Sequence, residues 1–235
     1  GFLTGILGTA SGGIIVVLLK KFDEKILTFV LGVSAGVMTV IVFLDLIPEA
    51  IEYGTMGAAL AGMLIGVVII AMLDYVFPHE HFKGHIIGQG FYKTGILLAL
   101  GIALHNLPEG LAIGASYSAA RTLGISLAVI IGIHNFPEGM AVATSLSLAR
   151  ISSLKIVLIT VFAGLPMGLG AFLGAYLGNI SDFFLSMSLG FAAGAMLFIT
   201  FDDLLPSAHQ SNKGKSAIMG ILLGVFAGIY ITTSL

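Results

Sequence analysis

Long runs of apolar residues dominate this chain, and short polar segments separate them. Each run is about as long as the ~20 residues that a helix needs to cross ~30 Å of hydrocarbon. Runs of this length indicate helices, because a helix satisfies its own backbone hydrogen bonds inside lipid. The pattern predicts eight transmembrane helices, at residues 2–19, 26–50, 56–76, 94–117, 122–148, 155–178, 183–206 and 216–234.

The composition is typical of an integral membrane protein rather than of a soluble core. Of the 235 residues, 57% are hydrophobic and 9% are charged. The chain has no Cys, which excludes disulfides and thiolate ligands. A net charge of −2 argues against a nucleic-acid partner. We expect an all-α polytopic protein in a lipid bilayer, with a single transmembrane domain over residues 1–235.

The Lys and Arg residues are distributed unevenly over the expected connections. Nine of the ten lie on one side of the membrane, namely Lys20, Lys21, Lys25, Lys83, Lys93, Arg150, Lys155, Lys213 and Lys215. Arg121 alone falls on the other side. Because basic loops stay in the cytoplasm, this asymmetry predicts a cytoplasmic loop at 77–93 and both termini outside.

A sequence repeat relates the two ends of the chain. The segment 32–38, GVSAGVM, matches 190–196, GFAAGAM, and DLIP at 45–48 matches DLLP at 203–206; the offset is 158 in both cases (190 − 32 and 203 − 45). Five spans separate equivalent elements, so the copies run in opposite directions. This pattern predicts a 3+2+3 inverted repeat, with 1–76 and 155–235 flanking a central helix pair at 94–148. The repeated glycines are expected to allow close helix packing.

The central pair carries one six-residue word twice, HNLPEG at 105–110 and HNFPEG at 134–139. In a helix, the His, the Asn and the Glu of each copy share one face. The Pro of each copy removes a backbone hydrogen bond, which would free the carbonyls of Leu104 and Ile133. Polar contact between helices is the alternative role for any one of these side chains. Ionisable groups at membrane depth cost about 2.5–3.5 kcal/mol each, however, and the duplicated word favours a cation site.

The ligand types narrow the class of cation. Imidazole nitrogen with carboxylate and amide oxygen suits Zn²⁺, Fe²⁺, Mn²⁺, Co²⁺ and Cd²⁺, whereas an all-oxygen site would indicate Ca²⁺ or Mg²⁺. No catalytic cofactor is expected. The predicted ligands are His105, Asn106, Glu109, His134, Asn135 and Glu138.

Two further groups of polar residues have open roles. Four carboxylates near helix ends either line an entrance or exit for the ion or are interfacial groups that reach water, namely Asp45, Glu49, Asp202 and Asp203. Three histidines of the 77–93 loop either collect metal or are simply solvated, namely His79, His81 and His85.

Eight spans, a 3+2+3 inverted repeat and the doubled HNxPEG word together resemble the ZIP (Zrt/Irt-like) family of divalent metal transporters, in particular its bacterial ZupT-like branch. The resemblance covers the whole chain. It implies uptake of Zn²⁺ and related metals into the cytoplasm across a bacterial inner membrane. It also implies a site between spans four and five, and elevator-like motion of spans one, four, five and six against spans two, three, seven and eight.

The chain departs from that family in span six. Relatives with a two-metal site carry a Glu in a segment that reads roughly Gly-Leu-Ser-Glu-Pro, and Met167 stands at that place here, in GLPMG at 164–168. A thioether is a poor Zn²⁺ ligand beside hard oxygens. We therefore expect one tightly held ion, ligated by His105, Glu109, Glu138 and His134, with the two Asn residues forming at most a weak second site. The alternative is that Met167 packs between spans and a carbonyl or water replaces the ligand.

Two alternative functions are compatible with the same ligands. A metal-selective channel is the nearer alternative, because ligands alone do not distinguish a pore from a carrier. An intramembrane zinc hydrolase is the more distant one: the chain has no HExxH word and no separate base beside three ligands and an open position. The sequence leaves a homodimer and the energy source open.

Overall fold

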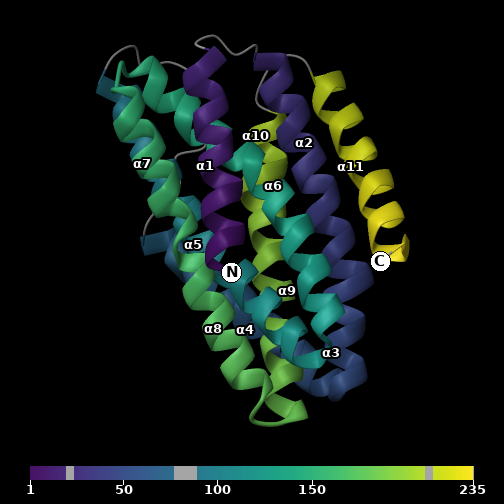
Figure 1. The fold of residues 1–235 in the computed structure, drawn as a ribbon. Coiled ribbons are helices and arrows are strands. Elements are labelled where there is room, and N and C mark those ends of the chain that lie inside the picture. The colour runs from purple at the N-terminus through teal and green to yellow at the C-terminus, as the bar shows by residue number, and fades with distance from the viewer. Residues whose placement is uncertain (20–23, 77–88, 210–213, 235) are drawn as a thin grey trace.

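The computed structural model describes residues 1–19, 24–76, 89–209 and 214–234, and these residues are almost entirely helical (Figure 1). In chain order the elements are α1 (Phe2–Leu19), α2 (Glu24–Val40), the π-helical segment η1 (Ile41–Leu46), α3 (Ile47–Tyr53), α4 (Met56–Val76), α5 (Gln89–Ala119), α6 (Arg121–Leu148), α7 (Ser153–Gly164), α8 (Pro166–Gly178), α9 (Asp182–Ile199), the π-helical segment η2 (Thr200–Leu204), α10 (Leu205–His209) and α11 (Gly214–Ser234).

Eight of the helical stretches are long and apolar enough to cross a membrane, as the hydrophobic pattern predicts. They are Phe2–Leu19, Thr28–Tyr53, Met56–Tyr75, Gly95–Ala119, Arg121–Leu148, Ser153–Gly178, Asp182–Asp202 and Lys215–Thr233. The predicted all-α class with eight spans is confirmed, with ends displaced by a few residues. Three of the spans are not regular α-helix throughout, because η1 lies in the second, η2 begins near the end of the seventh, and α7 and α8 divide the sixth.

The two π-helical segments lie at equivalent places in the repeat. The N–H of Ile47 donates to the carbonyl of Val42, and the N–H of Leu205 donates to that of Thr200, five residues back in each case. A proline follows directly, at Pro48 and at Pro206. A proline has no N–H, and its ring clashes with the carbonyl four residues earlier. A wider turn just before it accommodates the ring.

Two glycine contacts are related by the 158-residue offset of the sequence repeat. Gly32 of α2 lies against the carbonyl of Ala217 in α11, 2.6 Å from where its Cβ would be. Gly190 of α9 lies in the same way against the carbonyl of Ala59 in α4. The two contacts are related by the sequence offset of 158, since 32 + 158 = 190 and 59 + 158 = 217. The repeated glycines are thus packing residues that bring helix backbones together.

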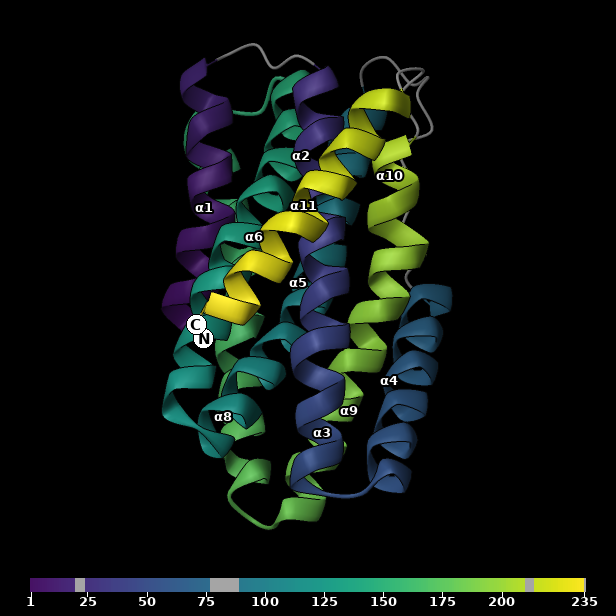
Figure 2. The same ribbon diagram turned by 90° about the vertical axis from the view of Figure 1, so that its right-hand side faces the viewer.

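The helices pack in closely contacting pairs. The most extensive contacts pair α5 with α8, α1 with α6, α2 with α11 and α4 with α9. We call α1, α5, α6, α7 and α8 the site bundle, and α2, α3, α4, α9, α10 and α11 with both π-helical segments the framework bundle. Figure 2 shows α1, α6 and α8 on one side and α4 and α9 on the other. Contacts between the bundles are less extensive than these four pairings and join α5 to α9, α2 to α6 and α8 to α9. The contact of α5 with α9 is more extensive than those that join α2 and α11 to α4 and α9 within the framework bundle.

Candidate metal centre

Both copies of the six-residue word are buried within the site bundle, one on α5 and one on α6. Each helix is continuous through the proline of its copy, Pro108 in α5 and Pro137 in α6. All six predicted ligands are between 0% and 3% exposed, namely His105, Asn106, Glu109, His134, Asn135 and Glu138. Polar side chains that are this deeply buried require partners in the protein or a bound ion.

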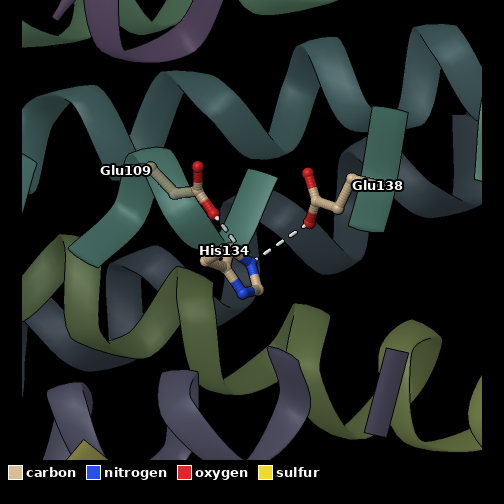
Figure 3. A group of neighbouring side chains, drawn as sticks. All are labelled: Glu109, His134 and Glu138. Carbon is tan, nitrogen blue, oxygen red and sulfur yellow. Dashed lines mark ion pairs between the residues drawn. The ribbon is translucent and has the colours of Figure 1, made fainter. Parts of the chain in front are cut away.

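Three of the six side chains converge on one point. Nε2 of His134 lies 3.5 Å from Oε1 of Glu109 and 3.3 Å from Oε1 of Glu138 (Figure 3). One ligand atom from each of the three lies within 4.8 Å of the others. One imidazole and two carboxylates are a ligand set that suits Zn²⁺ and similar first-row dications. The two carboxylates also supply two negative charges where a dication would sit.

Some polar atoms of this group make no hydrogen bond within the described protein. Nδ1 of His134 and Oε2 of Glu138 are both buried and have no hydrogen-bond partner. An unsatisfied buried polar atom is costly, and in native proteins it calls for an explanation such as a bound ion. This feature sets the group apart from a structural hydrogen-bond network.

His105 is buried one helical turn before Glu109 on α5 but is not part of the group of three. The four-residue spacing places both side chains on one face of α5. Its role as a fourth ligand stays a prediction.

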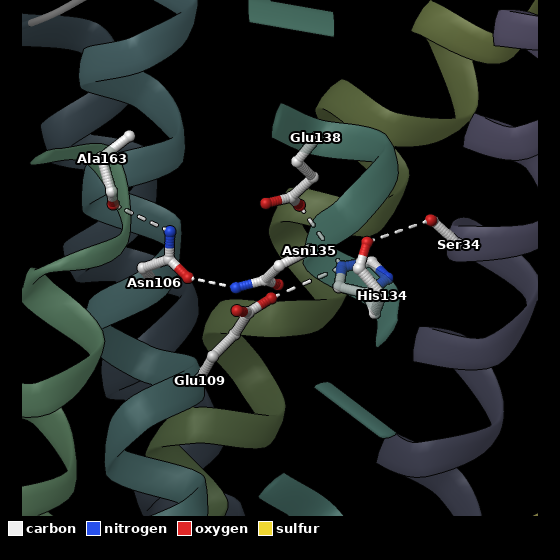
Figure 4. Close-up of polar contacts among 7 residues, drawn as sticks. All are labelled: Ser34, Asn106, Glu109, His134, Asn135, Glu138 and Ala163. Atoms are coloured by element: carbon white, nitrogen blue, oxygen red, sulfur yellow. Dashed lines mark hydrogen bonds and ion pairs between the residues drawn. The ribbon is translucent and has the colours of Figure 1, made fainter. Parts of the chain in front are cut away.

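The two Asn side chains are bonded to each other. Nδ2 of Asn135 donates to Oδ1 of Asn106 at 2.6 Å, and Nδ2 of Asn106 donates to the carbonyl of Ala163 at 2.9 Å (Figure 4). These contacts connect α6, α5 and α7 in turn. The structure therefore places both residues beside the group of three, with amide atoms engaged in protein contacts.

A framework residue also reaches the site. The hydroxyl of Ser34 on α2 donates to the carbonyl of His134 at 3.4 Å, so this contact crosses from the framework bundle to the site bundle. Neither Ser34 nor the Ala163 carbonyl was identified from the sequence. Ser34 lies 100 residues from His134, and no local pattern marks it or a backbone oxygen as part of the site.

Met167 is fully buried in the first turn of α8, where span six restarts after its break. Its Cβ lies 2.9 Å from the Cβ position of Gly5 in α1, and its carbonyl lies against Gly110 of α5. The side chain thus belongs to a tight junction of three helices, which supports the packing role considered for it above.

Two of the four predicted pathway carboxylates line a cavity. Asp45 and Glu49 border a space of about 250 Å³ whose other lining residues are Ala120, Thr122, Leu123, Ser126, Leu127, Ile130 and Thr232. Asp202 is partly buried and does not line this cavity. The Asp203 side chain and the loop residues His79, His81 and His85 lie outside what the structure describes.

Comparison with known proteins identifies the family. The family model described as ZIP Zinc transporter matches residues 78–235. A zinc transporter ZupT of Akkermansia muciniphila is 34% identical over 243 residues, covering 93% of this chain and 90% of that protein. Proteins of the same name from Campylobacter jejuni and Corynebacterium glutamicum are 33% and 36% identical, and they cover 92% and 93% of this chain and 89% and 91% of their own lengths. With its eight spans and its buried Glu-His-Glu group, this chain belongs to the ZIP family of metal transporters and is not an enzyme.

Proposed function

We propose that this protein carries Zn²⁺, and with it Fe²⁺, Mn²⁺, Co²⁺ or Cd²⁺, into the cytoplasm across a bacterial inner membrane. The observation that carries this proposal is the buried convergence of Glu109, His134 and Glu138 between two membrane-spanning helices. The two carboxylates balance the charge of one dication, which lowers the cost of holding it away from water. His105 completes the set as a fourth ligand from the same face of α5.

The cavity at Asp45 and Glu49 serves as the entrance in this proposal. It is lined by Ala120 and Thr122, which flank the connection between α5 and α6, the connection that the basic-residue count places outside. Its wall includes Ile130, four residues and hence about 6 Å along α6 from His134. Two carboxylates at the mouth would attract a cation toward the site.

Transport by an elevator-like carrier is the proposed mechanism. In such a carrier the site bundle moves as a unit against the framework bundle, which requires each bundle to be tightly packed. Close glycine contacts support this within the site bundle, where Gly114 abuts Ala171, and within the framework bundle, where Gly36 abuts Ile221. The Ser34–His134 hydrogen bond crosses the boundary and is long at 3.4 Å, so it is weak enough to break during such a motion.

Metal uptake by sealed proteoliposomes tests the function. Purified protein should support saturable uptake of Zn²⁺ and of the other four ions, whereas protein-free vesicles should not. Flux that rises with ion concentration without saturating, and that follows the membrane voltage steeply, would instead support the metal-selective channel. Metal binding without flux would contradict transport.

The orientation is testable because the chain has no native Cys. A Cys at position 84, in the 77–93 loop, should be protected from an impermeant thiol reagent in intact cells. A Cys at Ser126, in the wall of the entrance cavity, should react with the reagent from outside. Labelling of Gly84→Cys in intact cells would reverse the orientation, and failure of Ser126→Cys to react even after the cells are opened would remove the cavity as an entrance.

We expect one tightly bound ion per chain, because Met167 supplies no charge to offset a second dication. Titration of the detergent-solubilised protein with Zn²⁺ or Cd²⁺ should give one tight ion per chain within the membrane region. Met167→Glu should create a second tight site if the helix junction accommodates the carboxylate. Two tight ions in the parent protein that persist in Met167→Ala would refute the single-ion site.

A further inference from the structure

We propose that a groove between α1 and α6 binds one acyl chain of a membrane phospholipid, and that this chain lies against the part of α6 that carries the metal ligands. The two helices pack side by side in the site bundle (Figure 1). This inference goes beyond the proposed function, because lipid binding can be measured without any metal ion.

The groove is an apolar hollow of about 500 Å³. Leu3 and Leu7 of α1 line one side, Val129 and Ile133 of α6 line the other, and these four side chains are between 55% and 74% exposed. Eight of the ten lining residues are apolar or glycine. Both helices are membrane spans, so a groove between exposed apolar side chains of α1 and α6 opens toward the hydrocarbon of the bilayer.

Two glycines form the floor of the groove. The Cβ position of Gly8 lies 2.7 Å from the carbonyl oxygen of Gly132, so the backbones of α1 and α6 touch there. The Cβ position of Gly132 meets no backbone this closely: its nearest neighbours are Thr4 Cγ2 at 3.3 Å and the Thr4 carbonyl oxygen at 3.9 Å. Close backbone packing therefore does not require a glycine at position 132, and the missing side chain leaves the groove open.

The offsets of the sequence repeats account for the groove. The contact of Gly139 with Thr9 and the contact of Gly110 with Met167 are related by these offsets, since 9 + 158 = 167 and 139 − 29 = 110. By the same offsets, four groove residues correspond to four larger residues, namely Thr4 to Phe162, Gly8 to Pro166, Ser11 to Leu169 and Gly132 to Ala103. The volume that the groove lacks is thus apolar side-chain volume, which a hydrocarbon chain can replace.

The shape of the groove favours an acyl chain as the occupant. Its lining residues run from Leu3 to Ser11 on α1 and from Ala128 to Phe136 on α6, which is about 12 Å along each helix. A groove that follows two membrane-spanning helices runs in the same general direction as the lipid tails. The Ser11 hydroxyl donates to the carbonyl of Gly8 at 2.7 Å, so its proton is already engaged within α1.

An acyl chain in this groove would support the ligand-bearing part of α6. Ile133 and Phe136 line the groove, and His134 lies between them in the sequence. An unfilled hollow forfeits van der Waals contacts for the atoms that line it. A bound chain restores these contacts on the lipid-facing side of α6, opposite the interior of the site bundle.

The first test counts phospholipids that stay bound to the full chain. Protein from vesicles of phosphatidylethanolamine and phosphatidylglycerol is washed with lipid-free detergent, and the retained lipids are counted by native mass spectrometry. The parent should retain one phospholipid per chain. Gly132→Leu, whose side chain projects into the groove, should retain none, and Thr4→Phe, which introduces the larger residue found at position 162, should do the same.

A control variant and a cross-linking measurement locate the lipid. Gly57→Leu adds the same side chain on α4, where only Thr55 Oγ1 lies near the Cβ position, and should keep the lipid. A phosphatidylcholine with a photoreactive group on its acyl chain should label residues 3–11 and 128–136 of the parent in excess over the exposed Leu60 and Leu64 of α4. Gly132→Leu should lose this excess and keep the labelling of α4.

Equal lipid retention by the parent, Gly132→Leu and Thr4→Phe would overturn the proposal, and so would labelling of α4 as dense as that of the groove. The second result would show only the ordinary lipid layer around a membrane protein. A disulfide between two copies of Leu7→Cys, in a chain with no native Cys, would assign the groove to a second copy instead. Failure of metal uptake would refute the proposed function and leave the lipid result intact.

Discussion

Replacing Glu109 or Glu138 with Ala should abolish metal uptake while the protein still inserts and folds. Each carboxylate lies within 3.5 Å of His134 Nε2 and supplies half of the negative charge that balances the ion. Removing one partner from a buried charged group costs about 3–5 kcal/mol, which corresponds to at least a 100-fold loss of ion affinity. The measurement is the initial rate of Zn²⁺ uptake into proteoliposomes with equal amounts of inserted protein.

A matched control is available on α3. Glu52 is exposed, lies outside the site, and can be changed to Ala with no expected loss of uptake. If Glu109→Ala or Glu138→Ala transported at the parent rate, the assignment of the metal site to this group would be wrong.

The second large effect is expected when Ala replaces glycines that have no role in binding the ion. Gly110 on α5 lies against the carbonyl of Met167, and Gly139 on α6 lies against that of Thr9 on α1. A Cβ at either position would collide with backbone atoms of the neighbouring helix. A side chain could change its rotamer to avoid such a collision, but the backbone of a helix cannot. Forcing extra volume into packed interiors costs about 1–3 kcal/mol. We therefore expect Gly110→Ala and Gly139→Ala to lower the melting temperature in detergent and to reduce uptake strongly. The added methyl group must push α5 away from α8, or α6 away from α1, and so displace the ligands.

Gly57 provides the control for this experiment. Only Thr55 Oγ1, at 3.9 Å, lies near its Cβ position, so Gly57→Ala should leave both stability and uptake unchanged. Parent-like melting and uptake in Gly110→Ala would show that the contact between α5 and α8 yields easily. The site bundle would then not be the rigid unit that the carrier mechanism needs.

The family comparison and the fold bear out much of what the sequence predicts. The eight spans follow from the length of the apolar runs, because lipid requires a helix of about that length. The 158-residue offset predicts an inverted repeat, and the contacts Gly32–Ala217 and Gly190–Ala59 are related by the same offset. The six buried polar side chains follow from the duplicated word, since ionisable groups are rarely kept at membrane depth without a function.

The sequence by itself determined the spans and the set of candidate ligands, because these depend on local composition and on repetition along the chain. Only the tertiary structure decided that Glu109, His134 and Glu138 converge while Asn106 and Asn135 bond each other, and that Ser34 and the Ala163 carbonyl join the site. The helical period places a side chain on a face of its own helix. Which faces meet depends on how each helix is rotated about its axis and on its position along that axis relative to its neighbours. In this protein, contacts between glycines and the backbone of the facing helix fix the rotation and the position.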